Sequence, residues 1–105
     1  MKEYEIMYLV KPNYGNEQYE EIEKKMLSWL EKGKGKIIFS EKWGLRDLAT
    51  KLDKYDRAYY IITRFEGDNE TLKNLKNQLK ISEDIFRYMI IDAKSLPKIA
   101  KSKEV

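Results

Sequence analysis

The chain has 105 residues, 42% of them hydrophobic and 37% charged, which is the size and composition expected of one soluble domain with a single core. Cysteine and histidine are both absent, and this excludes disulfides, zinc and iron–sulfur centres, thiol nucleophiles and every histidine-based triad. The net charge is only +3, no apolar run is as long as a membrane span, and no signal peptide can be read at the N-terminus, so we expect a cytoplasmic protein without metal or cofactor.

The first part of the chain predicts a strand followed by a helix. Residues 2–10 alternate between two sets of side chains, as in a strand, and a turn that contains proline and glycine follows. Asn16 is the expected N-cap of an amphipathic helix that has Glu17 in its first turn and ends near Gly33. Met26 and Trp29 lie on the apolar stripe of this helix, and at that spacing they indicate core packing rather than a ligand site.

The rest of the chain predicts a long hairpin, a second helix and a last strand. Residues 35–52 have strand character that is interrupted at Gly44, which permits a β-bulge that redirects the strand. Residues 58–65 form the strongest strand and should pair with the preceding one in antiparallel fashion. A helix capped by Asp68 and a strand over residues 85–91 complete the pattern.

The element order is β-α-β-β-α-β, which predicts an α+β, ferredoxin-like fold with two helices on one face of a four-stranded antiparallel sheet. We assign residues 1–94 to this domain and residues 95–105 to a basic, flexible C-terminal tail. No helix is left to cover the opposite face, which by strand phase carries Met7, Leu9, Tyr60, Ile62, Arg64, Arg87, Met89 and Ile91. An open apolar face usually marks a partner surface, although flanking loops or the tail could lie over it instead.

The charges are unevenly distributed along the chain. Residues 17–31 are rich in glutamate, whereas residues 32–64 are rich in lysine and arginine. A nearly neutral chain with a basic middle and tail can present one basic face to phosphates. The same distribution also fits a solvated surface with a solubilising tail, so charge alone leaves both interpretations open.

The middle of the chain contains a motif that resembles one found in a known protein family. Residues 43–49 form a Trp-Gly-x-Arg-x-Leu-Ala string, which resembles bacterial small-subunit ribosomal protein six. Residues 4–7, the Pro12-Asn13 pair, Tyr59 with Phe65, and residues 87–90 resemble that family in the same order. The resemblance spans residues 2–94, with departures at Thr50-Lys51, where the family commonly has Tyr-Pro, and at Ala58, where it commonly has glycine.

The resemblance implies a structural constituent of the bacterial small (30S) ribosomal subunit, with no catalytic activity. It implies binding to 16S ribosomal RNA together with the small basic ribosomal protein numbered eighteen. Matching positions make Arg46, Lys54 and Arg87 candidates for RNA contact, because cations gain affinity through counterion release and arginine also grips phosphate or stacks on bases. Further candidates, chosen as basic residues near these three, are Lys2, Lys42, Lys51, Arg57 and Arg64.

The expected surface for the protein partner comprises Met7, Leu9, Trp43, Tyr60, Ile62, Met89 and Ile91. We expect Trp43 to pack at the edge of the sheet, with partner docking as an alternative role. The cations also have structural alternatives. Arg46 could pair with Asp47 or Asp53, and Arg87 could be a satisfied cation on the sheet.

Three other functions share this topology. RNA-recognition motifs stack bases on aromatic residues of the third strand, but here Tyr60 occupies the position of a small residue and Ile61 that of an aromatic one. Acylphosphatase-like enzymes need a phosphate-cradling loop after the first strand, and residues 11–15 lack such a nest of free amides. A protein-interaction or ligand-sensing domain without RNA is the alternative that the fold alone permits.

Overall fold

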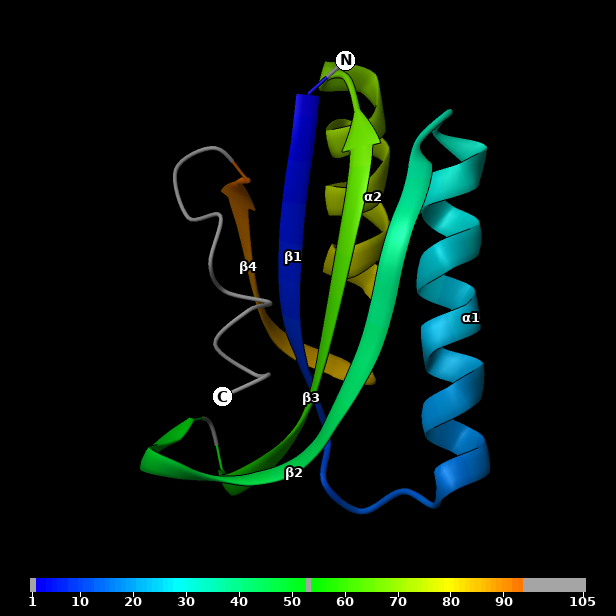
Figure 1. Ribbon diagram of the computed structural model, residues 1–105. Helices are drawn as coiled ribbons and strands as arrows, with labels where there is room; N and C mark the ends of the chain where they lie inside the picture. Colours follow the sequence, from blue (N-terminus) through cyan, green and yellow to red (C-terminus); the bar gives the residue numbers. More distant parts are fainter. Residues whose placement is uncertain (1, 53, 94–105) are drawn as a thin grey trace.

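The computed structural model describes residues 2–52 and 54–93 and confirms the ferredoxin-like α+β fold (Figure 1). The elements, in chain order, are β1 (Lys2–Val10), α1 (Asn16–Lys32), β2 (Lys36–Leu52), β3 (Tyr55–Gly67), α2 (Asn69–Ile81) and β4 (Ile85–Asp92). The strands form one antiparallel sheet in the order β2-β3-β1-β4, and both helices lie on the same face of it. The tail predicted over residues 95–105 lies outside the described residues.

Each helix begins where the backbone finds a capping partner. α2 is capped as predicted, because Asp68 accepts a hydrogen bond from the backbone N–H of Thr71 at 3.0 Å and the Thr71 hydroxyl accepts one from the backbone N–H of Asp68 at 3.2 Å. The N-cap of α1 is Gly15 and not Asn16, so that prediction is wrong by one residue. The reason is that the Gln18 side chain accepts the N–H of Gly15 at 3.0 Å, which starts the helix one residue earlier.

The core lies between the sheet and the two helices. Its buried residues are Ile6, Tyr8, Val10, Tyr19, Ile22, Met26, Leu30, Ile61, Phe65, Leu75, Leu79 and Ile85. The packing role predicted for the α1 stripe is confirmed, since Met26 is fully buried and Trp29 packs against the same cluster. Tyr19 of α1 stacks on Tyr59 of β3 with ring centroids 3.6 Å apart, which fixes the N-terminal end of α1 on the sheet.

The C-terminal end of α1 is tied to the start of α2 by two side chains. The hydroxyl of the fully buried Thr71 donates to the carbonyl of Gly33 at 2.7 Å. The amide of Asn74 donates to the carbonyl of Trp29 at 3.1 Å. The first bond satisfies the carbonyl of Gly33 just after α1, and the second adds a donor to the carbonyl of Trp29, which also accepts the backbone N–H of Gly33 at 3.2 Å.

β2 and β3 extend past the rest of the sheet. β3 runs from Tyr55 to Gly67, longer than the predicted strand 58–65, and it pairs with β1 only from Tyr59 onward. Residues 46–52 and 54–58 therefore form a two-stranded projection, which we call the arm. Figure 1 shows it curving away beneath the sheet.

Gly44 marks the point where β2 bends toward the arm. Its φ is +93°, a conformation that favours glycine, and the pairing register with β3 shifts between Lys42 and Gly44. Both observations confirm the predicted bulge, which redirects the strand. The glycine of the sequence motif thus sets the direction of the arm.

Candidate nucleic-acid and protein interface

The arm gathers four of the predicted RNA-binding cations, namely Arg46, Lys51, Lys54 and Arg57, and all four are exposed. Arg57 lies 3.3 Å from Asp47, but these side chains are 53% and 89% exposed, so water and salt weaken the pair. Arg46 forms no ion pair with a described residue. Since Asp47 and Asp56 are the only acidic residues in the described part of the arm, the projection is net positive.

Aromatic and apolar side chains hold the arm and cover part of it. The ring of Tyr55 contacts that of Phe86 at the start of β4, with centroids 4.8 Å apart, so the arm is anchored to the opposite edge strand. Leu45, just before the arm, is 40% exposed, and Leu48 is only partly buried. The arm therefore offers apolar contacts beside its cations.

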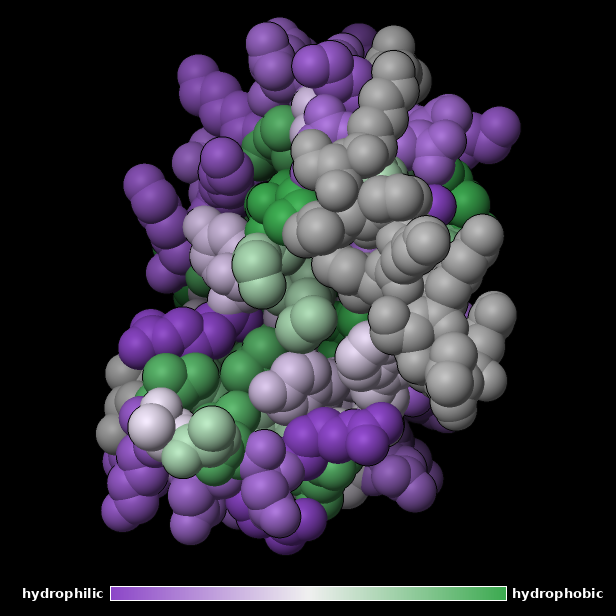
Figure 2. All heavy atoms as spheres, turned by 60° about the vertical axis from the view of Figure 1, so that its left-hand side comes forward, coloured by the Kyte–Doolittle hydropathy of each residue, from purple (hydrophilic) through white to green (hydrophobic). Residues whose placement is uncertain are grey.

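The predicted partner face is assembled as the strand phase indicated. Met7 of β1 stands opposite Ile62 of β3 and Met89 of β4. In the same way, Leu9 stands opposite Tyr60 and Arg87, and Ile91 stands opposite Glu5. Figure 2 shows hydrophobic side chains between charged ones on this side of the molecule. We call this set the open face.

The residues of the open face are not equally available. Met89 is 53% exposed, and Met7, Tyr60 and Ile91 are partly exposed. Leu9 is 8% exposed and Ile62 only 1%, so these two predicted contact residues offer little surface. The surface that a partner could touch therefore includes fewer residues than the sequence predicted.

Arg64 has a structural environment on the open face. Its guanidinium lies 2.7 Å from a carboxylate oxygen of Glu5 and 3.8 Å from one of Glu3. Its Cζ lies 5.8 Å from the ring centroid of Phe39, and its side chain is 18% exposed. Arg64 is thus a satisfied cation on the sheet.

Glu5 and Phe39 were missed by the sequence reasoning. Glu5 is 1% exposed, and its second carboxylate oxygen has no hydrogen-bond partner among the described residues. The sequence did contain a signal for Glu5. Its carboxylate falls on the same face of the first strand as Met7, and it stands opposite Arg64 in the sheet. Phe39 had no such signal, because the register shift between Ile37 and Phe39 decides which face it occupies.

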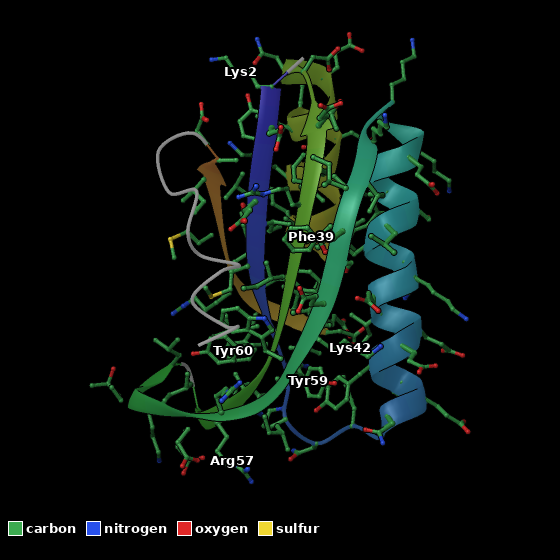
Figure 3. All side chains as sticks on the ribbon, in the orientation of Figure 1. Lys2, Phe39, Lys42, Arg57, Tyr59 and Tyr60 are labelled. Atoms are coloured by element: carbon green, nitrogen blue, oxygen red, sulfur yellow. The ribbon has the colours of Figure 1, made fainter. Side chains whose placement is uncertain are left out.

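Two neighbouring candidates on β2 have different surroundings. Lys42 points to the helix side, where its Nζ lies 3.3 Å from Glu23 of α1 (Figure 3). Trp43 is partly buried on the outermost strand, in agreement with the predicted packing at the sheet edge. Lys42 therefore contributes to helix packing, while partner docking by Trp43 remains a prediction.

The last two candidate cations lie apart from the arm. Lys2 is exposed at the start of β1, at the opposite end of the sheet from Arg57 (Figure 3). Arg87 is exposed on β4 and makes a long contact of 3.5 Å with the carbonyl of Phe86. The structure thus concentrates four predicted cations on the arm and distributes the others over both faces and the far end.

Three tyrosines among the described residues have a pKa above the ordinary value for that side chain. Tyr14 donates its hydroxyl proton to Asp84 at 2.7 Å, and this hydrogen bond, with burial, raises the pKa of Tyr14 to about 12. Burial likewise raises the pKa of Tyr8 and of Tyr19. All three hydroxyls therefore stay protonated at neutral pH, which makes them poor nucleophiles or bases.

Two kinds of feature are absent from the described residues. No cluster of acidic side chains there could hold a metal ion. No helix in the described part of the chain is long and apolar enough to cross a membrane.

Comparison with known proteins gives a consistent result. The family model of ribosomal protein S6 matches residues 3–92. Small ribosomal subunit protein bS6 of Fusobacterium nucleatum is 35% identical over 91 residues, covering 87% of this chain and 97% of that protein. The bS6 protein of Natranaerobius thermophilus is 36% identical over 90 residues, covering 86% and 94%.

Solved structures agree with this result at the level of the fold. The crystal structure of 30S ribosomal protein S6 from Thermotoga maritima superposes with a TM-score of 0.85 at 26% identity, covering 99% of this chain and 98% of that one. The C-terminal domain of MgtC from Mycobacterium tuberculosis reaches a TM-score of 0.57 at 7% identity over 88% of this chain, which is a likeness of fold alone.

Proposed function

Because the chain belongs to the ribosomal protein S6 family, we propose that it binds 16S ribosomal RNA through its arm and docks the small basic ribosomal protein numbered eighteen on its open face. Membership of this family makes the chain a structural protein of the bacterial small ribosomal subunit, located in the cytoplasm, and not an enzyme. The predicted family and the predicted absence of catalysis are thereby confirmed. The RNA and protein contacts are the subject of the proposal.

The observation that carries the RNA part is the group of exposed cations on the arm. Arg46, Lys51 and Lys54 form no ion pair with a described residue, so RNA phosphates would replace water and counterions rather than compete with internal carboxylates. The arm projects past the rest of the sheet (Figure 1), so its cations lie away from the body of the domain. The planar guanidinium of Arg46 adds two-pronged phosphate contact or base stacking.

The protein part rests on the mixed chemistry of the open face. Met89, Met7 and Ile91 supply adaptable apolar surface. Glu3, which is 45% exposed by its side chain, adds negative charge at the margin of the same face. Apolar surface beside a carboxylate is complementary to a basic protein partner.

A neutralised arm tests the RNA contact. We expect the triple variant Arg46→Gln, Lys51→Gln, Lys54→Gln to bind 16S RNA, in the presence of the partner protein, about tenfold or more weakly at moderate salt. The slope of log K against log salt should become shallower by about two units, since each lost phosphate contact removes about 0.7–0.9. Filter binding over a salt series measures both quantities.

A matched variant keeps this experiment interpretable. Lys24→Gln, Lys25→Gln, Lys32→Gln removes the same charge from exposed positions of α1 and should bind almost as the wild type does. If both variants lost the same RNA affinity, the arm would matter only through the net charge of the protein, and the proposal would be contradicted.

A charged residue at the centre of the open face tests the protein contact. Met89→Lys should weaken binding of the partner protein about tenfold or more, because it buries an unpaired cation in the interface, while the domain stays folded since Met89 is half exposed. Ile81→Lys is the control, because Ile81 is 74% exposed at the end of α2. Unchanged partner affinity for Met89→Lys would remove the open face from the proposal.

A further inference from the structure

The two helices differ sharply in charge. α1 carries five glutamates and three lysines, whereas α2 carries Lys73, Lys76 and Lys80 against a single acid, Glu70. The three lysines are exposed and recur at a spacing of three and four residues, which places them along one side of α2. Like charges at this spacing repel one another and destabilise a helix, and none of the three forms an ion pair with a described residue.

These lysines line a hollow between α2 and the edge strand β4. Its volume is about 390 Å³, and the side chains of Asn69, Asn77 and Tyr88 share its wall with the three lysines. Tyr88 is 40% exposed, although it is a large aromatic residue. The hollow therefore combines cations, amide donors and an accessible aromatic ring, and no acidic residue lines it.

Two further hollows on the helix side of the described residues contain acidic side chains. The hollow between Trp29 and Ile81 includes Glu83 and Asp84. The hollow beside Tyr14 includes Glu21 and Asp84. An anion is therefore favoured in the α2–β4 hollow and opposed in these two.

We propose that this hollow, which we call the α2 groove, is a second RNA contact on the helix side of the sheet, with its lysines on backbone phosphates and the ring of Tyr88 against a base. The inference rests on the proposed RNA-binding function but concerns a different surface, because the arm and the open face do not include α2. Lysines supply the affinity by counterion release, and an exposed tyrosine ring is a stacking surface that any base can use.

The position of β4 connects the α2 groove with the predicted contact at Arg87. β4 is an outer strand of the sheet, and neighbouring residues of a strand point to opposite faces. Arg87 stands opposite Leu9 of the open face, while Tyr88 lines the groove on the helix side. An RNA segment that follows the β4 edge would thus meet cations on both faces of the sheet.

A triple variant tests the α2 groove directly. Lys73→Gln, Lys76→Gln, Lys80→Gln should weaken binding to 16S RNA, with the partner protein present, about tenfold or more and make the salt slope shallower by about two units. The α1 triple variant Lys24→Gln, Lys25→Gln, Lys32→Gln, with the same loss of charge, should change affinity less than about twofold. All six side chains are exposed, so both variants should keep the fold, which circular dichroism verifies.

Tyr88 provides an independent readout of stacking. Tyr88→Leu should weaken RNA binding at every salt concentration without changing the salt slope, because stacking involves no counterion release. Tyr88→Phe should keep the wild-type affinity, since the aromatic ring alone is enough for stacking. If the Tyr88→Leu and Tyr88→Phe variants bind RNA equally well, base stacking at this position is refuted.

The outcomes separate this inference from the proposed function. Wild-type affinity of the α2 variant together with a loss in the arm variant would overturn the α2 groove and leave the arm proposal intact. Loss in the α2 variant with an unchanged arm variant would support the groove and contradict the arm. Sedimentation experiments test a different occupant of the α2 groove. If the α2 triple variant is monomeric where the wild type is a dimer, and its RNA affinity is unchanged, the groove binds the acidic α1 of a second copy and the RNA contact is refuted.

Discussion

Arg64 was predicted to bind RNA, but it is held in an ion pair with Glu5. A substitution can decide whether Arg64 stabilises the fold or contacts RNA. Its guanidinium makes contacts of 3.0 and 2.7 Å with one oxygen of Glu5, directly across the β1–β3 ladder. The side chains are 18% and 2% exposed, so this is a largely buried pair. Arg64→Met keeps most of the aliphatic stem beside Phe39 and removes the guanidinium, with its charge and its hydrogen bond to Glu5.

The expected cost follows from the burial of the carboxylate that remains. Removing one partner of a buried ion pair leaves an uncompensated charge and typically costs about 3–5 kcal/mol of the free energy of unfolding. The 18% exposure of Arg64 lets water reach part of the site, which favours the lower end, about 3 kcal/mol. The double variant Glu5→Met, Arg64→Met should recover most of this loss, because two apolar residues then pack with Met7 and Ile91 on the open face.

Urea denaturation followed by circular dichroism measures these differences. Arg57→Met is the matched control, since Arg57 lies on the same strand but its pair with Asp47 is solvent-exposed and should contribute no more than about 1 kcal/mol. A loss for Arg64→Met no larger than that of Arg57→Met would refute the assignment of Arg64 to the fold. If the double variant folds and binds 16S RNA with wild-type affinity, Arg64 is not an RNA contact.

Two further predictions concern the junction of the helices. Thr71→Val, which has nearly the same shape, should lower the free energy of unfolding by about 1–3 kcal/mol because it leaves the carbonyl of Gly33 and the N–H of Asp68 without a partner, whereas Thr71→Ser should retain most of the stability in the same urea titration. The hydrogen bond from the Thr71 amide holds the pKa of Asp68 below its ordinary 3.8, so the charged cap stabilises the fold fully above that pH and progressively less as the pH falls through the lowered value. The stability difference between the wild type and Asp68→Asn should accordingly shrink below pH 3.8, and a difference that stays constant under acid would contradict this cap.

The local pattern of the sequence predicted the elements well, because strand alternation, helical spacing and capping chemistry are local properties. The cap at Asp68, the stripe through Met26 and the bulge at Gly44 were all predicted, and the structure contains each of them. The error at Asn16 has a simple cause. Asparagine is a common N-cap, but the reach of Gln18 back to the N–H of Gly15 decides the start of α1, and several residues in this turn have similar local preferences.

The predicted site illustrates the limit of such patterns. The strand phase correctly placed Met7, Ile62 and Met89 on one face, but it could not show that Ile62 is buried while Met89 is half exposed. Nor could it separate Lys42, which is held by Glu23 of α1, from the exposed cations of the arm. These distinctions depend on contacts between segments that are far apart in the chain.

The sequence by itself thus determined the order of the elements, the two faces of each strand and, through its motif, the family. Only the tertiary structure decided which cations are exposed and which are neutralised, as Arg64 is by Glu5 at a separation of 59 residues. The physical reason is that alternation and helical spacing are set by neighbouring backbone geometry, whereas the charge that a side chain presents to a partner depends on burial and on counter-charges brought by other elements.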